Sequence, residues 1–379
     1  MMGPFSIDTY LPSFREMEIA LGATPIQIQQ SLTAFLLPFA FMSLWHGALS
    51  DALGRRRVII AGFAIVTVAS VGCALARNVE ALWTFRALQG LAAGMFVVGR
   101  AVVRDVYEGP AAQRVISQIS VLFAVAPAIA PVIGGYLHEW FGWRSVFYFM
   151  ALFAGIVSLW SWWSLPETLP PDRRHALHAG RLARAYGASL SHHGFVACAL
   201  ASAFAFMAIF LYIADANALL VRHLHVSETA FFILFGPVTA GMMLGGWLSG
   251  RLAGKLDSTH TIAWSFFTML LATGANVAFH LLHSAVLPWT VVPLFFYATG
   301  MSLSMPTLTL IGLDYFPARR GLASSCQAFI LTAGNAVTAG LLAPFAATSP
   351  LRIALVSASL TLVALCCLPF IRRGKAIVG

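Results

Sequence analysis

The chain has 379 residues, of which 59% are hydrophobic and only 10% are charged. Soluble domains carry roughly one quarter charged residues, so this composition excludes a water-soluble globular protein. The formal net charge of +9 does not indicate a nucleic-acid partner, because the basic residues fall on alternate loops rather than in one patch.

Long apolar runs recur from one end of the chain to the other, separated by short polar stretches. A membrane helix needs about 20 mostly apolar residues. The sequence therefore predicts an all-α integral membrane protein with twelve transmembrane helices in two six-helix bundles. We expect the spans at residues 1–17, 27–49, 57–76, 81–104, 113–137, 143–165, 194–222, 228–253, 260–282, 286–312, 320–347 and 350–371.

The longest polar stretch, residues 166–193, contains three prolines, four arginines and four histidines. We expect it to be a cytoplasmic linker between an N-terminal bundle, 1–165, and a C-terminal bundle, 194–379. If the first loop is outside, the inside segments hold sixteen basic residues and the outside segments five. The positive-inside rule then predicts that both termini are cytoplasmic.

The first span, 1–17, reaches polar residues at Arg15 and has too few apolar residues to cross a bilayer in full. Its start lacks the basic residues of a signal peptide. We therefore expect that the first helix is truncated and that further N-terminal sequence precedes Met1.

Two of the fourteen acidic residues, Asp8 and Asp215, fall inside apolar spans. An ionised carboxylate in the bilayer costs at least a few kcal/mol, so such residues are usually functional. Desolvation favours the neutral acid, which suits Asp8 to take up and release a proton. The alternative for both residues is a structural carboxylate, fixed by an arginine or by backbone groups.

The predicted fourth span ends at Arg104, on the cytoplasmic side, and contains two further arginines within the membrane. Arg86 lies near its outer end, at a depth similar to that of Asp8, and its permanent charge suits it to act as a counter-ion. A structural donor of hydrogen bonds that locks helices together is the alternative. Arg100 follows fourteen residues later, on almost the same face of a continuous helix, and we expect a structural or gating role for it.

Proline and glycine concentrate in the predicted fifth span, where Pro127, Pro131, Gly134 and Gly135 favour a bent, closely packed helix. Other polar residues at depth either line a cavity or bond neighbouring helices. The candidates for cavity lining are Tyr10, Arg100, Gln118, Tyr212, Asn217, Gln327 and Asn335, and Asn276 is open to the same two interpretations.

Enzymatic and ATP-driven functions find little support. The stretch from Gly250 to Lys255 lacks the spacing of a phosphate-binding loop, and no Ser/His/Asp arrangement is evident. The five cysteines lie in apolar stretches at no spacing typical of disulfides or zinc. We expect no cofactor and no metal, and a polytopic membrane enzyme or sensor is the remotest alternative.

Five segments carry a family resemblance. Residues 47–57, Gly-Ala-Leu-Ser-Asp-Ala-Leu-Gly-Arg-Arg-Arg, resemble the loop 2–3 signature of the major facilitator superfamily. Residues 85–90, Phe-Arg-Ala-Leu-Gln-Gly, resemble its span-four motif, and residues 126–135 resemble its antiporter motif. Residues 6–12 and 100–105 are similar to the Bcr/CflA branch of drug:proton antiporters, which confer bicyclomycin and chloramphenicol resistance.

This resemblance implies roles for individual residues. Asp8 would bind protons and recognise cations, with Arg86 as its electrostatic partner. The implied cytoplasmic gate comprises Gly47, Asp51, Gly54 and Arg55, and the implied antiporter bend comprises Pro127, Pro131, Gly134 and Gly135. Asp215 departs from the branch, which has small residues followed by proline there, and this acid would either change the substrate or add a second coupling site.

The predicted function is proton-coupled efflux of small drug-like molecules across the cytoplasmic membrane by alternating access. Its partners would be the substrate, protons and the lipid bilayer, with no nucleic acid, and the protein would act as a monomer. A specific carrier of a sugar, an amino acid or an organic ion with the same fold is the open alternative.

Overall fold

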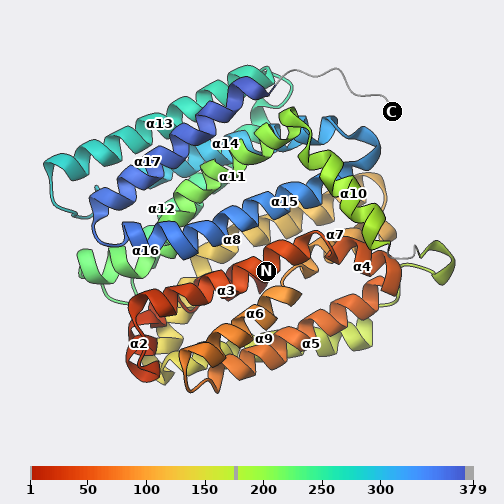
Figure 1. The fold of residues 1–379 in the computed structure, drawn as a ribbon, viewed down its shortest axis with the longest axis horizontal. Coiled ribbons are helices and arrows are strands. Elements are labelled where there is room, and N and C mark those ends of the chain that lie inside the picture. Colours follow the sequence, from red (N-terminus) through yellow and green to blue (C-terminus); the bar gives the residue numbers. More distant parts are fainter. Residues whose placement is uncertain (1, 175–177, 372–379) are drawn as a thin grey trace. The chain divides into compact units, whose positions relative to one another are not determined.

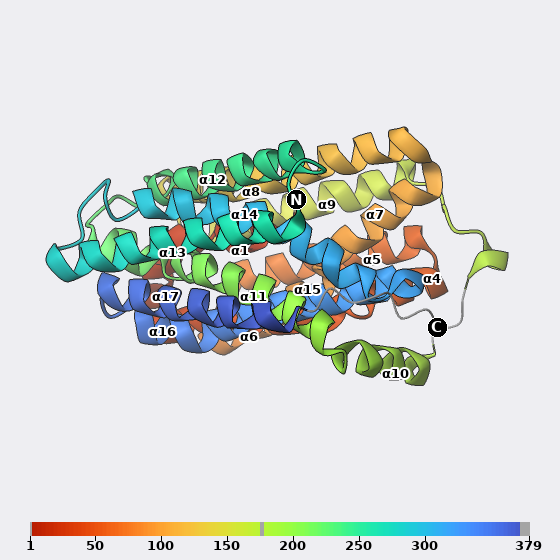
Figure 2. The same ribbon diagram turned by 90° about the horizontal axis from the view of Figure 1, so that it is seen from above.

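The structure is a computed structural model that describes residues 2–174 and 178–371. Within these residues the chain forms helices and no strand. It divides into two compact units, Met1–Ala179 and Gly180–Gly379, and this division falls inside the polar stretch 166–193. Figures 1 and 2 show the helices of each unit, and the two units are described separately below.

The first unit contains nine α-helices and two short 3-10 turns among its described residues, and α10 begins at its last residue. In chain order they are α1 Met2–Asp8, a 3-10 turn at Leu11–Ser13, α2 Phe14–Leu21, α3 Pro25–Ser43, α4 His46–Leu53, α5 Arg55–Ala74, α6 Val79–Ala92, α7 Met95–Val106, α8 Gly109–Phe141, α9 Trp143–Ser164 and a 3-10 turn at Pro171–Arg173.

The second unit takes in α10 and all later helices. They are α10 Ala179–Leu190, α11 His193–Ala214, a π-helix at Ala218–His223, α12 Phe232–Leu252, α13 Ser258–Leu282, α14 Val292–Asp314, a 3-10 turn at Pro317–Arg319, α15 Arg320–Val337, a π-helix at Thr338–Leu342, α16 Ala343–Ala346, α17 Pro350–Cys367 and a 3-10 turn at Leu368–Phe370.

Every predicted span overlaps a helix or a run of helices. In the described part of the chain, nine helical segments are long and apolar enough to cross a membrane, and α3 with α4 makes a tenth if this pair, bent by 56°, is one span. The other two predicted spans correspond to the broken run Met2–Leu21 and to the 33-residue α8. The structure thus agrees with the predicted membrane fold and adds breaks that hydropathy does not reveal.

Within the first unit, α3 packs on α6 and α5 packs on α9. Gly90 of α6 allows the first of these contacts, because a Cβ atom there would lie 2.1 Å from the carbonyl oxygen of Phe35. Small residues let membrane helices approach in this way. The close approach brings the face of α6 that carries Arg86 against α3.

In the second unit, α11 is buried along most of its length and packs on α14, α15 and α17, while α12 and α13 pack on α14. The linker helix α10 docks on α15, where Tyr186 lies near Cys326. Burial raises the pKa of Tyr186 to about 12, although a hydrogen bond with Ser325 opposes the shift. Part of the predicted linker is therefore packed against the second bundle.

Candidate functional site

The predicted first span is broken at the residue that matters most for function. Helix α1 ends at Asp8, and a 3-10 turn begins at Leu11. Pro12 has no N–H to donate to the carbonyl of Asp8, four residues earlier. The N–H of Ser13 donates to Tyr10 at 3.0 Å rather than to Thr9. The sequence around Pro12 thus ends the helix at Asp8 and leaves two non-helical residues after it.

The carboxyl group of Asp8 is buried, with 4% of the residue exposed. Among the residues that the structure describes, none forms an ion pair or a side-chain hydrogen bond with it. A carboxyl group in such surroundings is more stable when protonated than when charged, because neither water nor a cation compensates the charge. This arrangement suits the reversible binding of a proton.

Arg86 is fully buried in α6. Its guanidinium carbon lies 4.4 Å from the ring centre of Tyr10 and 4.6 Å from that of Phe35. One amino group donates to Oε1 of Gln89 at 2.7 Å, and the other, Nη2, has no hydrogen-bond partner among the described residues. Arg86 is therefore enclosed by two aromatic rings and neutral acceptors.

A hydrogen-bond network extends from Arg86 to the neighbouring helices. Nε2 of Gln89 donates to the hydroxyl of Ser70 in α5 at 2.7 Å. The hydroxyl groups of Tyr10 and Ser31 are bonded at 2.9 Å. Arg86 thus touches the turn after Asp8 through Tyr10 and touches α3 through Phe35. The structure brings Asp8 and Arg86 to the same break without joining them in an ion pair.

The predicted antiporter bend lies against this break. Pro127 and Pro131 are inside the continuous helix α8, and Pro131, Gly134 and Gly135 are buried. A Cβ atom at Gly134 would lie 1.7 Å from the carbonyl oxygen of Thr9. The fifth predicted span therefore meets the first at the residue that follows Asp8.

The predicted cytoplasmic gate forms a compact ionic cluster within the first unit. Arg55 forms ion pairs with Asp51, at 2.5 Å, and with Asp105, at 3.2 Å, and its backbone N–H donates to Glu167 at 2.9 Å. Gly54, before α5, has a φ of +97°, and a Cβ atom there would lie 2.2 Å from a Glu167 oxygen. Gly47 lies in the first turn of α4.

No pattern in the sequence indicates a specific role for Asp105 or Glu167. The signal for Asp105 was its place at the end of residues 100–105, which carry part of the resemblance. Glu167 stands 112 positions from Arg55, so no local pattern joins them.

In the second unit, three predicted site residues are buried near the end of α11: Tyr212, Asp215 and Asn217, with 2%, 1% and 3% of each exposed. The side-chain amide of Asn276 in α13 donates to the hydroxyl of Tyr212 at 2.8 Å. Asp215 caps the C-terminus of α11 just before the π-helix. These contacts connect α11 to α13 and favour helix bonding as the role of Asn276.

The remaining predicted residues lie apart from these clusters. In α15, Asn335 is buried and Gln327 is half-buried beside Gly312. Arg100 and Gln118 are exposed positions of the first unit. The expectation that Arg100 shares a face with Arg86 assumed one continuous helix. In the structure α6 ends at Ala92 and α7 begins at Met95, so the regular helical spacing does not apply across the break.

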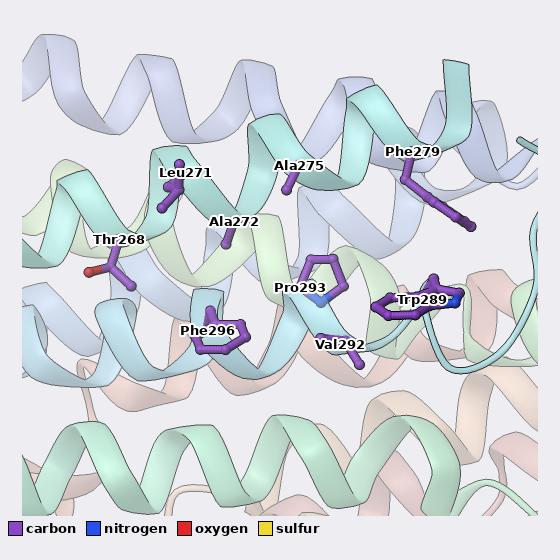
Figure 3. A pocket seen from close by; sticks show the side chains of 9 residues that line it. All are labelled: Thr268, Leu271, Ala272, Ala275, Phe279, Trp289, Val292, Pro293 and Phe296. Atoms are coloured by element: carbon purple, nitrogen blue, oxygen red, sulfur yellow. The ribbon is translucent and has the colours of Figure 1, made fainter. Parts of the chain in front are cut away.

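A groove of about 410 Å³ lies between α13 and α14 in the second unit. Figure 3 shows side chains of both helices bordering it, among them Leu271 and Phe296. Its walls are apolar, and Leu271, Trp289 and Phe296 are 64%, 59% and 50% exposed. None of the predicted site residues lines it. The groove therefore belongs to the apolar outer surface of two candidate membrane spans.

Comparison with known proteins identifies relatives along the whole chain. The uncharacterized MFS-type transporter YdgK of Bacillus subtilis is 30% identical over 328 residues, 86% of this chain and 81% of that one. Multidrug resistance protein D of Escherichia coli is 27% identical over 378 residues, 98% and 93% of the two chains. A bicyclomycin resistance protein homolog of Haemophilus influenzae is 25% identical over 346 residues, 90% and 86%.

The fold has equally broad matches. A crystal structure of a D-xylose-proton symporter covers 99% of this chain and 98% of its own, with a TM-score of 0.75 and 14% identity, which concerns the fold alone. The sequence profile of the Major Facilitator Superfamily matches residues 1–339. The resemblance of the motifs to this superfamily and to its drug-resistance branch is confirmed. The chain belongs to the major facilitator superfamily and is a multi-pass membrane transporter rather than an enzyme.

Proposed function

We propose that this transporter exports small drug-like molecules in exchange for protons. The observation that carries the proposal is the state of Asp8, a buried carboxyl group at a helix break with no cationic partner among the described residues. Such a group is the simplest device for coupling alternating access to protons, because it binds one proton from one side of the membrane and releases it on the other.

The cycle follows from competition for one carboxyl group. When the cavity opens inward, a lipophilic or cationic compound displaces the proton from Asp8, and when it opens outward, a proton displaces the compound. Arg86 stays charged throughout, and its contacts are with Tyr10, Phe35 and Gln89 rather than with Asp8. Tyr10 connects Asp8 with Arg86, since it follows Asp8 by two residues and its ring covers the guanidinium group of Arg86.

The substrate class is supported by the relatives, whose names include multidrug and bicyclomycin resistance proteins. Residence in the cytoplasmic membrane, cytoplasmic termini and action as a monomer are part of the same proposal. The cluster around Arg55 acts as the cytoplasmic gate, in which Asp51 and Arg55 exchange partners as the cavity opens and closes. The four residues of the antiporter bend shape α8, and Asp215 adds a second acid to the pathway.

The test is the replacement Asp8→Asn, which keeps the size of the side chain and removes its titration. In inverted membrane vesicles with an imposed pH gradient, we expect uptake of a labelled lipophilic cation to fall to the level of vesicles without the transporter. The matched control is Glu80→Gln, an exposed acid in the first turn of α6, which should transport normally. Gel filtration checks that both variants assemble.

Normal gradient-driven uptake by Asp8→Asn would overturn the proposal. Counterflow in the unaltered protein tests the substrate class: exchange of drugs supports efflux, whereas exchange of a sugar or an amino acid without exchange of any drug would instead identify a metabolite carrier.

A further inference from the structure

A close backbone approach between α8 and the broken first span occurs one residue after Asp8. At Gly134, a Cβ atom would lie 1.7 Å from the Thr9 carbonyl oxygen and 2.7 Å from its carbon. Both neighbours are backbone atoms, so no side-chain rotation relieves the contact. Among the glycines of the first unit that the structure describes, Gly90 approaches a carbonyl oxygen in a comparable way, but that oxygen belongs to Phe35 of α3.

The carbonyl of Thr9 faces α8 because the helix is broken. In a continuous helix the N–H of Ser13 would donate to this oxygen. It donates instead to Tyr10, and Pro12 gives the preceding carbonyl no donor at all. A carbonyl outside the helical pattern needs another partner, and the Cα–H of a glycine is a weak one that recurs where membrane helices meet.

Apolar contacts align the same two helices on the other side of Asp8. Phe5 of α1 packs with Ala126 and Ala130 of α8. Ala126, Ala130 and Gly134 follow one another at intervals of four residues, so they form a single row along α8. Asp8 therefore lies between two contacts with α8. Before it, Phe5 packs on Ala126 and Ala130, and after it, the Thr9 carbonyl lies against Gly134.

We propose that Gly134 is a positioning residue for Asp8, since it seats the broken backbone after Asp8 on α8 and so keeps the carboxyl group away from water. The inference rests on the proposed role of Asp8 in proton coupling. It gives one glycine of the antiporter bend a specific task that is distinct from bending its own helix.

The variant Gly134→Ala tests the contact. A methyl group cannot stay within 3.0 Å of the Thr9 oxygen, so the break must move by at least 1.3 Å, the difference between 3.0 and 1.7 Å. The displaced break admits water to Asp8. We expect the midpoint of substrate-triggered proton release from the purified protein to shift by about one pH unit towards acid, because water stabilises the charged carboxylate.

The matched control is Gly3→Ala, which adds the same methyl group to α1 at a position with no atom within 4 Å and should leave the midpoint unchanged. If Gly134→Ala does not assemble, Pro12→Ala replaces it. This change restores a backbone N–H that can donate to the Asp8 carbonyl and lets the helix continue past Asp8, so the Thr9 carbonyl no longer rests on Gly134. The midpoint of substrate-triggered proton release should therefore shift as well.

The outcomes distinguish a failure of the proposed function from a failure of the positioning role of Gly134. Proton release by Asp8→Asn at the level of the unaltered protein would overturn the proposed function itself. If Asp8→Asn abolishes release while Gly134→Ala, or Pro12→Ala in its place, keeps the original midpoint, the positioning role is wrong and the function stands. A lower amplitude without a shifted midpoint would show a general packing defect and would also overturn the inference.

Discussion

Arg86 shows how a single buried charge is accommodated in the first unit. No carboxylate lies within ion-pair distance of it among the described residues, although an isolated buried charge costs several kcal/mol. Two aromatic faces contribute about 2 kcal/mol each when desolvated, and a hydrogen bond from a charged group contributes about 1.5–3 kcal/mol. The contacts with Tyr10, Phe35 and Gln89 are therefore of the size needed to hold the guanidinium group without an acid.

We expect Arg86→Lys to lose both stability and transport. An ammonium group has no planar face to stack between Tyr10 and Phe35 while it bonds Gln89. The expected loss is about 2–3 kcal/mol of unfolding free energy. It is measured in detergent by the reaction of a fluorogenic maleimide with the buried thiols of Cys73, Cys198 and Cys326. Arg104→Lys, at an exposed position, is the control, and equal stability of the two variants would contradict the stacking.

At the scale of the element, helix α5 depends on a residue that follows α9. Glu167 accepts a hydrogen bond from the backbone of Arg55, and its other oxygen lies 3.6 Å from Arg174. A carboxylate at a helix N-terminus satisfies a free N–H and interacts favourably with the helix dipole. Gly54 makes room for this carboxylate with a backbone conformation, φ +97°, that other residues rarely adopt.

Removal of this cap should destabilise the start of α5. We expect Glu167→Ala to lower the unfolding free energy by about 1 kcal/mol, and Glu167→Gln to lower it less, because an amide oxygen still accepts the hydrogen bond. The same thiol-reaction assay measures both, with the exposed Asp172→Ala as control. If Glu167→Ala has the same free energy of unfolding as the unaltered protein, the cap contributes nothing to stability.

The chain as a whole forms two compact units, and the boundary between them lies near residue 180. The motifs of the antiporter family and the Asp8 break all lie in the first unit, whereas Tyr212 and Asp215 lie in the second. The proposed cytoplasmic linker, residues 166–193, spans this change. It carries four of the 23 basic residues, so the proposed orientation of the protein makes it accessible from one side of the membrane.

Protease access tests this orientation. Trypsin cleaves after lysine and arginine, and we expect limited digestion of inverted vesicles to cut first in the linker, the longest polar stretch, at Arg173, Arg174, Arg181 or Arg184. This first cut gives two fragments of roughly equal size. Sealed right-side-out vesicles should protect the same sites. Cleavage in right-side-out vesicles with protection in inverted ones would reverse the predicted topology.

Three properties follow from the amino-acid sequence alone: that the protein lies in a membrane, where its spans fall along the chain, and which polar residues are buried within apolar segments. Hydropathy is a property of short segments, and an acid within an apolar run is visible without any knowledge of the fold. The family motifs around Asp51, Arg86 and Pro127 are equally local. These parts of the fold and site could therefore be predicted.

The contacts between distant residues are visible only in the folded structure. It placed rings rather than a carboxylate around Arg86, brought Glu167 to Arg55, and set Gly134 against Thr9. It also divided predicted spans at Thr9–Tyr10 and at Ala93–Gly94. Contacts between residues far apart in the chain depend on how close the helices approach and on how each is rotated. Those quantities arise from packing along entire helices, which no local pattern contains.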